Sequence, residues 1–79
     1  MLIANKAHLR EFLWQELENS VYTVSDIAIH KTGYCVDIVA YVSEDLVSPH
    51  YRSELKDKLD DLIMFPMSIS GFKMIGKKA

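Results

Sequence analysis

The sequence predicts a small α+β domain in which two helices pack on one face of a three-stranded mixed sheet. Two amphipathic stretches have the apolar spacing of helices, and three stretches rich in β-branched or large apolar residues are typical of strands. In chain order these stretches cover residues 3–19, 21–30, 34–42, 49–63 and 67–75. The chain has 79 residues, so we expect residues 1–79 to form a single domain around one core.

The first helix is indicated by an apolar stripe that recurs every fourth residue. Its members are Leu9, Leu13 and Leu17. Asn5 can cap the helix by accepting a hydrogen bond from a free backbone amide, and Asn19 begins the polar stretch that ends it. Trp14 lies away from the stripe, which leaves it available for a second contact surface.

The next two stretches predict a β-hairpin, because turn residues separate two runs with the composition of strands. If Thr32 and Gly33 form a two-residue loop, Ile29 lies opposite Val36, and the two side chains point to the same face of the sheet. One face of the hairpin is then apolar, as packing against helices requires. Residues 34–42 are apolar on both sides, which favours a central position in the sheet.

The opposite face of the hairpin is also richer in apolar residues than a solvent-exposed face normally is. Its apolar members are expected to be Tyr22, Val24, Ala28, Cys35, Val39 and Tyr41. Asp26 and Asp37 share this face. A two-layer domain leaves such a surface uncovered, so we expect a partner to bind it.

The second helix begins at Ser48 and Pro49, a capping residue followed by a proline in the first turn. After it, residues 67–75 form a strand in which Gly71 marks a bulge. A strand that returns through a helix runs parallel to the strand it left, in a right-handed crossover. The last strand should therefore lie beside residues 34–42.

The order helix, strand, strand, helix, strand resembles the layout of type II KH-like domains. It is equally similar to truncated ferredoxin-like domains such as the cytoplasmic modules of cation diffusion facilitators. These resemblances imply a fold and no functional residue. RNA-binding KH domains use a Gly-x-x-Gly loop, which this chain lacks.

Composition and charge exclude several classes of protein. The formal net charge is -2, so no global field attracts the chain to nucleic acid or to an anionic membrane. A single cysteine, Cys35, excludes an internal disulfide and favours a cytoplasmic location. Neither a signal peptide nor an apolar run of about 20 residues is present, so we expect no membrane association.

A chemical site is not indicated. In the expected hairpin register His30 and Cys35 are cross-strand neighbours beside Asp37, but one cysteine and one histidine are a weak metal or nucleophile signature. We therefore predict no catalytic residues, no metal site and no cofactor.

The sequence thus favours a non-enzymatic protein-interaction module, such as a regulator, an inhibitor or an assembly subunit. We expect it to bind a protein partner, or a second copy in a homodimer, through the open sheet face or an edge strand. The expected contact residues are Tyr22, Val24, Val39 and Tyr41, with Trp14 as a further anchor. The alternative is a nucleic-acid-binding module that uses the sheet face with Lys73, Lys77 and Lys78.

Overall fold

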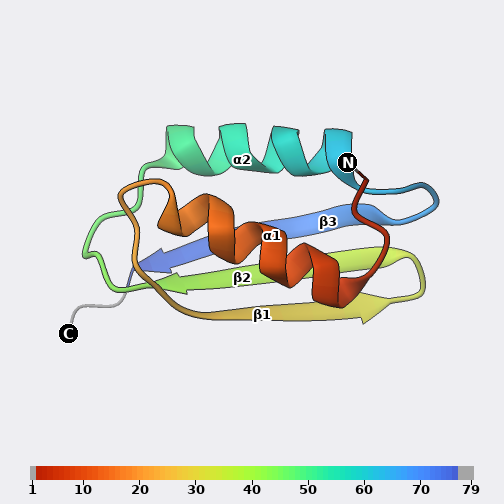
Figure 1. Ribbon diagram of the computed structural model, residues 1–79, viewed down its shortest axis with the longest axis horizontal. Coiled ribbons are helices and arrows are strands. Elements are labelled where there is room, and N and C mark those ends of the chain that lie inside the picture. The colour runs from red at the N-terminus through yellow and green to blue at the C-terminus, as the bar shows by residue number, and fades with distance from the viewer. Residues whose placement is uncertain (1, 77–79) are drawn as a thin grey trace.

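The computed structural model describes residues 2–76, which form two helices and three strands in the predicted order (Figure 1). The elements are α1 (Lys6–Glu18), β1 (Val24–Thr32), β2 (Cys35–Val42), α2 (Pro49–Leu62) and β3 (Ser68–Gly76). The predicted fold class, a small α+β domain with a mixed sheet, is confirmed.

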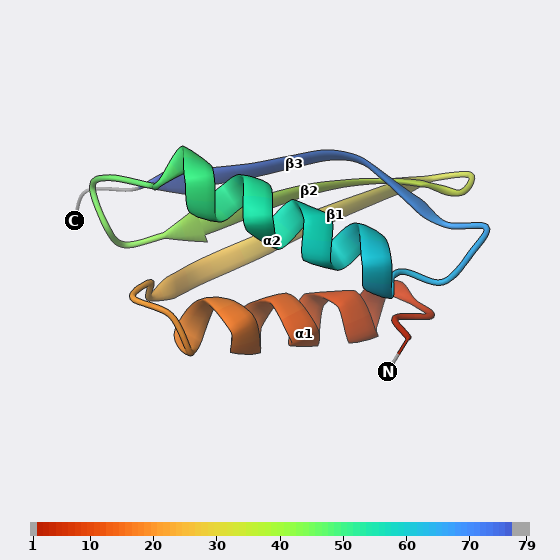
Figure 2. The same ribbon diagram turned by 90° about the horizontal axis from the view of Figure 1, so that it is seen from above.

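The sheet has the strand order β1-β2-β3, with β2 in the centre. β1 and β2 pair antiparallel, whereas β2 and β3 pair parallel and are joined by a right-handed crossover through α2 (Figure 1). Both helices lie on the same face of the sheet (Figure 2). The other face is covered by no helix of residues 2–76.

The hairpin loop lies one residue later than the sequence suggested. Gly33 and Tyr34 form the loop, and Thr32 pairs with Cys35. Gly33 has φ 62°, a left-handed conformation that glycine adopts without the cost a threonine would incur. Ile29 consequently pairs with Ile38 and not with Val36. Because each partner moves by two residues, the inward and outward faces stay as predicted.

A bulge at the start of β1 places two of the predicted contact residues in the core and not on the open sheet face. Val24 pairs with Val42, but Asp26 pairs with Tyr41, so Ser25 is an extra residue. The bulge turns Val24 towards the helices, where it is 9% exposed, and Tyr22 before it is 6% exposed. Tyr22 and Val24 therefore belong to the core, and their predicted place on the open face is wrong.

The core lies between the sheet and the two helices. The predicted stripe of α1 is fully buried, and the bulge before Gly71 shifts the register of β3 so that Ile69, Phe72 and Met74 all face the helices. Prominent core residues are Leu9, Leu13, Leu17, Val36, Ile38, Ala40, Val42, Leu55, Leu59, Ile69, Phe72 and Met74.

Capping residues fix where both helices begin. The Asn5 side chain accepts a hydrogen bond from the His8 amide at 2.8 Å, and the Ser48 hydroxyl accepts one from the Tyr51 amide at 3.2 Å. α1 begins at Lys6, three residues later than expected. Ile3 is instead extended and forms a parallel bridge with Ile63 at the end of α2.

Candidate interaction surface

The side of the sheet opposite the helices forms a broad surface, which we call the open sheet face (Figure 2). It carries the outward side chains of all three strands, in the alternation that a pleated sheet imposes. Its members are Asp26, Ala28, His30, Cys35, Asp37, Val39, Tyr41, Lys73 and Ile75.

Strand register arranges these side chains in rows that cross the sheet. The first two rows are Asp26, Tyr41, Ile75 and Ala28, Val39, Lys73. Within them Tyr41 and Val39 are half-buried, and Ile75 is 43% exposed. We call Ala28, Val39, Tyr41 and Ile75 the apolar patch. It is contiguous across three strands and has a charged residue at each side.

The third row is polar. His30 pairs with Asp37, and Asp37 pairs with Gly71. The Asp37 carboxylate accepts a hydrogen bond from the Ser70 hydroxyl at 3.1 Å and lies so close to Gly71 that an added Cβ would be 2.6 Å from Asp37 Oδ1. A shallow hollow of about 260 Å³ follows, between Asp37, Val39 and Lys73. The open sheet face therefore has an apolar half and a polar half.

The structure separates His30 from Cys35, which the sequence placed opposite each other. His30 pairs with Asp37, while Cys35 is exposed and pairs with Thr32 beside the loop. The geometric argument for a joint metal or thiolate site is therefore wrong. Within residues 2–76 there is no group of three or more His, Cys, Asp or Glu side chains that could hold a metal ion.

Val39 and Tyr41 are the predicted contact residues that the structure brings together on the open sheet face. Ile75 was missed, because its place beside Tyr41 depends on the register of β3 after the bulge. Alternation within residues 67–75 is the signal that could have found it, once the bulge at Gly71 is included.

Trp14 lies away from this face, at the side of α1 near β1. Arg10 stacks over its ring, with the guanidinium carbon 5.3 Å from the ring centroid. The same Arg10 donates a hydrogen bond to Asp26 Oδ1 at 2.9 Å and so joins α1 to β1. Trp14 is half-buried and cannot act as an anchor on the surface that holds Tyr41.

Two adjoining apolar hollows lie along this side of the molecule. One, of about 490 Å³, is lined by Lys6, Ala7, Arg10, Ile27 and Ile29. The other, of about 390 Å³, shares two of these residues and extends to Trp14. Together we call them the α1–β1 groove. It runs beside the outer edge of β1.

No protein-family model, curated protein or solved structure matches this chain. Among residues 2–76, neither helix has both the length and the apolar character needed to cross a membrane.

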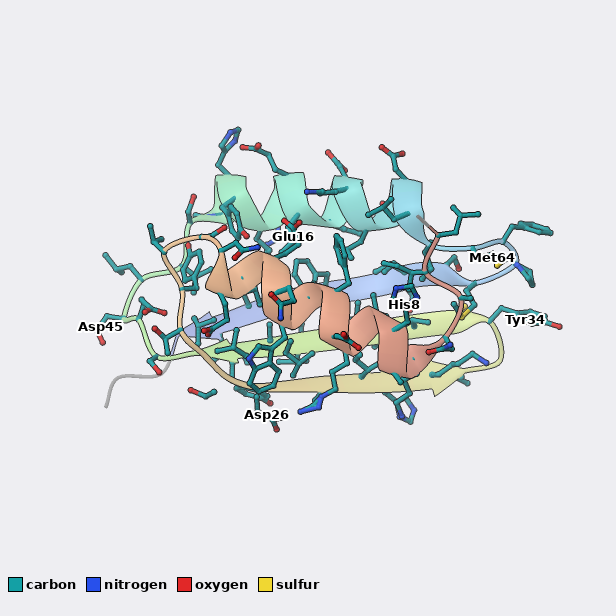
Figure 3. The ribbon with its side chains drawn as sticks, in the orientation of Figure 1. His8, Glu16, Asp26, Tyr34, Asp45 and Met64 are labelled. Carbon is teal, nitrogen blue, oxygen red and sulfur yellow. The ribbon has the colours of Figure 1, made fainter. Side chains whose placement is uncertain are left out.

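A further group of exposed apolar residues lies at the hairpin end of the molecule, where Tyr34 and Met64 point outward (Figure 3). Phe65 is 91% exposed, Tyr34 63%, Leu2 56% and Met64 46%. Three segments distant in the sequence meet here: the start of the chain, the hairpin loop and the connection from α2 to β3. The sequence analysis did not predict this group, because it placed Tyr34 in the strand after a Thr32–Gly33 loop.

Of the three lysines named for the nucleic-acid alternative, one lies among the described residues. Lys73 is exposed on the open sheet face, while Lys77 and Lys78 lie outside the described residues. Asp26 and Asp37 share that face with Lys73, as predicted. Tyr22, an aromatic side chain that the sequence placed on this face, is buried and cannot stack on bases there.

Proposed function

We propose that this protein is a small non-enzymatic interaction module that binds a protein partner through the open sheet face. The observation that carries the proposal is the apolar patch, which lies on a face that no helix of residues 2–76 covers. Antiparallel strands commonly expose one face, but that face is then predominantly polar. Here an aromatic and two β-branched side chains lie side by side on it.

Covering this patch with a partner's apolar surface favours binding, because each Å² of apolar surface removed from water contributes about 25 cal/mol before the costs of association. Tyr41 is well suited as an anchor, because aromatic side chains dominate the energetics of interfaces. The patch has the usual anatomy of an interface centre.

Charged residues beside the patch supply specificity. Asp26 and Lys73 lie on opposite edge strands, so the face is acidic at β1 and basic at β3. A partner with the reverse arrangement of charges is favoured over others, and it is held in one orientation. Such a module suits a regulator, an inhibitor or an assembly subunit.

The same charges argue against nucleic acid as the partner. Two of the charged side chains on the face are carboxylates, Asp26 and Asp37, which repel phosphate. Burial removes Tyr22 from the set of stacking residues. Lys73, on the edge strand β3, is then opposed by two acids on the same face.

The proposal is tested with matched substitutions of exposed or half-buried apolar residues by aspartate. Tyr41→Asp and Ile75→Asp alter the apolar patch, and Leu46→Asp, at an 86% exposed loop position, is the control. Each protein is immobilised and exposed to an extract of the native host cells. A captured protein is then purified and titrated against all variants by calorimetry.

We expect wild type and Leu46→Asp to bind the captured protein equally, and both patch variants to weaken binding at least about tenfold. The heat capacity change of binding should be negative, because apolar surface is buried. Equal binding by all four proteins contradicts the proposal. So does capture of nucleic acid whose affinity falls steeply between low and moderate salt.

A further inference from the structure

The outer edge of β1 pairs with no other strand of residues 2–76, so it presents free backbone groups. β1 is nine residues long and has β2 on one side only. The two-residue loop makes Thr32 and Cys35 a hydrogen-bonded pair, and bonded and non-bonded pairs alternate from there. Ala28 therefore directs its backbone groups towards β2, while Ile27 and Ile29 direct theirs outward. Edges of this length are places where chains associate.

We propose that two copies of the chain join through this edge, with their β1 strands antiparallel about a twofold axis beside Ala28. The two sheets then form one continuous sheet of six strands. Ile27 of each copy pairs with Ile29 of the other copy, and each pair exchanges two backbone hydrogen bonds. The outward backbone groups that the edge leaves free are satisfied in this way.

Side-chain contacts favour this register over the neighbouring ones. On the helix side it places Ile27 against Ile29 of the second copy, so apolar residues meet apolar residues. At the axis Ala28 faces its own counterpart, where side chains approach most closely and a small residue fits. A register moved to Ile29 as centre places Ile27 against Lys31, and one moved to Ile27 places Ile29 against Ser25. Each alternative keeps one Ile–Ile pair, at its centre, where the proposed register has two.

Charge complementarity supports the same register. Asp26 of each copy lies directly opposite His30 of the other, so the contact occurs twice in the dimer. Arg10 binds Asp26 through Oδ1, which leaves Oδ2 to accept a hydrogen bond from the incoming imidazole. The Arg10–Asp26 ion pair is between exposed groups and contributes little to stability, so it can adjust when the edges meet.

The α1–β1 groove gives the dimer its apolar centre. α1 runs opposite to β1, so Lys6 and Ala7 lie near Ile29, and Arg10 lies near Asp26 (Figure 1). The hollow of about 490 Å³ is lined by Ile27 and Ile29, which lie on either side of the axis at Ala28, so the hollows of the two copies adjoin across it.

The dimer joins the outer edge of β1, whereas the proposed partner binds across the open sheet face; Asp26 and Ala28 lie where the two regions meet, and Tyr41 and Ile75 lie outside the dimer contact. The open sheet faces of the two copies stay uncovered and form one face of doubled width, so each dimer presents two apolar patches. Failure of self-association leaves the partner-binding proposal standing, and loss of partner binding in the patch variants leaves the dimer unaffected.

The test uses charge substitutions that only a cross-paired dimer can compensate. Asp26→Lys alone sets lysine against histidine twice, and His30→Asp alone sets aspartate against aspartate twice. Mixing the two variants creates one Lys–Asp and one Asp–His contact. We expect each variant to raise the dimer dissociation constant about tenfold or more, and the mixture to form a heterodimer near wild-type affinity. Asp45→Lys, in an exposed loop, is the charge-matched control.

Light scattering over a range of concentrations measures the association, and thermal melting confirms that each variant folds. A wild-type protein that stays monomeric at millimolar concentration overturns the proposal. So do single variants that dimerise like wild type, or a mixture that restores nothing.

Discussion

Two tyrosines beside the sheet have opposite environments. Tyr22 is buried, its ring lies 5.3 Å from that of Tyr51, and its hydroxyl accepts a hydrogen bond from the Ser48 amide at 3.0 Å. Tyr41 is half-buried on the open sheet face, and no element of residues 2–76 covers its row. One tyrosine therefore stabilises the fold, and the other is available for binding.

Replacing each tyrosine by alanine should separate these roles. We expect Tyr22→Ala to lower the free energy of unfolding by about 3–5 kcal/mol, through a core cavity and an unpaired amide at the start of α2. Tyr41→Ala should cost about 1 kcal/mol, since its ring retains solvent on one side. Urea unfolding monitored by circular dichroism measures both. Equal losses would contradict the assignment of Tyr22 to the core.

At the scale of elements, carboxylates hold the short connection between α1 and β1. The Thr23 amide donates to both oxygens of Glu44, at 2.9 and 3.2 Å, and the Val24 amide donates to Glu18 Oε2 at 2.8 Å. These amides come before the regular ladder of β1 and would otherwise lack protein partners. The two side chains fix the bulged start of β1 against the end of α1 and the end of β2.

Loss of the Glu18 carboxylate should destabilise the start of β1. We expect Glu18→Ala to cost about 1.5–3 kcal/mol, the usual contribution of a hydrogen bond to a charged group. Glu11→Ala on the same helix is the matched control and should change stability by less than about 0.5 kcal/mol. Amide hydrogen exchange of Val24 should accelerate in the first variant alone. Unchanged exchange there would show that Glu18 does not hold the strand.

At the scale of the whole molecule, the start of the chain closes the helical layer. Ile3 is fully buried, its amide donates to the Leu62 carbonyl at 2.8 Å, and its carbonyl accepts from the Met64 amide at 2.8 Å. This bridge joins the segment before α1 to the segment after α2. Contacts between such distant residues raise the cooperativity of the fold.

Substitutions at the two neighbouring residues test this closure. Ile3→Ala should lower the free energy of unfolding by about 2–5 kcal/mol, because it opens a cavity among buried residues. Leu2→Ala, at a 56% exposed position, should alter it by less than about 0.5 kcal/mol. Chemical denaturation of both variants measures the difference. A similar, small effect at both positions would mean that the first residues are not part of the core.

Much of the fold could be predicted from local patterns. The apolar stripe of α1, the caps at Asn5 and Ser48, the central position of β2 and the bulge at Gly71 were all readable, because each depends on spacing or on the chemistry of one residue. The inward and outward faces of β2 were also correct. They stayed correct although the predicted hairpin loop was wrong, because the pairing partners differ by two residues and side-chain direction repeats every two residues.

The sequence by itself determined which elements form and which side of the central strand faces the helices. Tertiary structure decided the membership of the candidate surface: the bulge at Ser25 sent Tyr22 and Val24 inward, and the register of β3 brought Ile75 to Tyr41. The physical reason is that helix and strand patterns are local, whereas bulges and register are settled by pairing with distant strands. A single extra residue in a strand turns the side chains on one side of the bulge to the opposite face of the sheet.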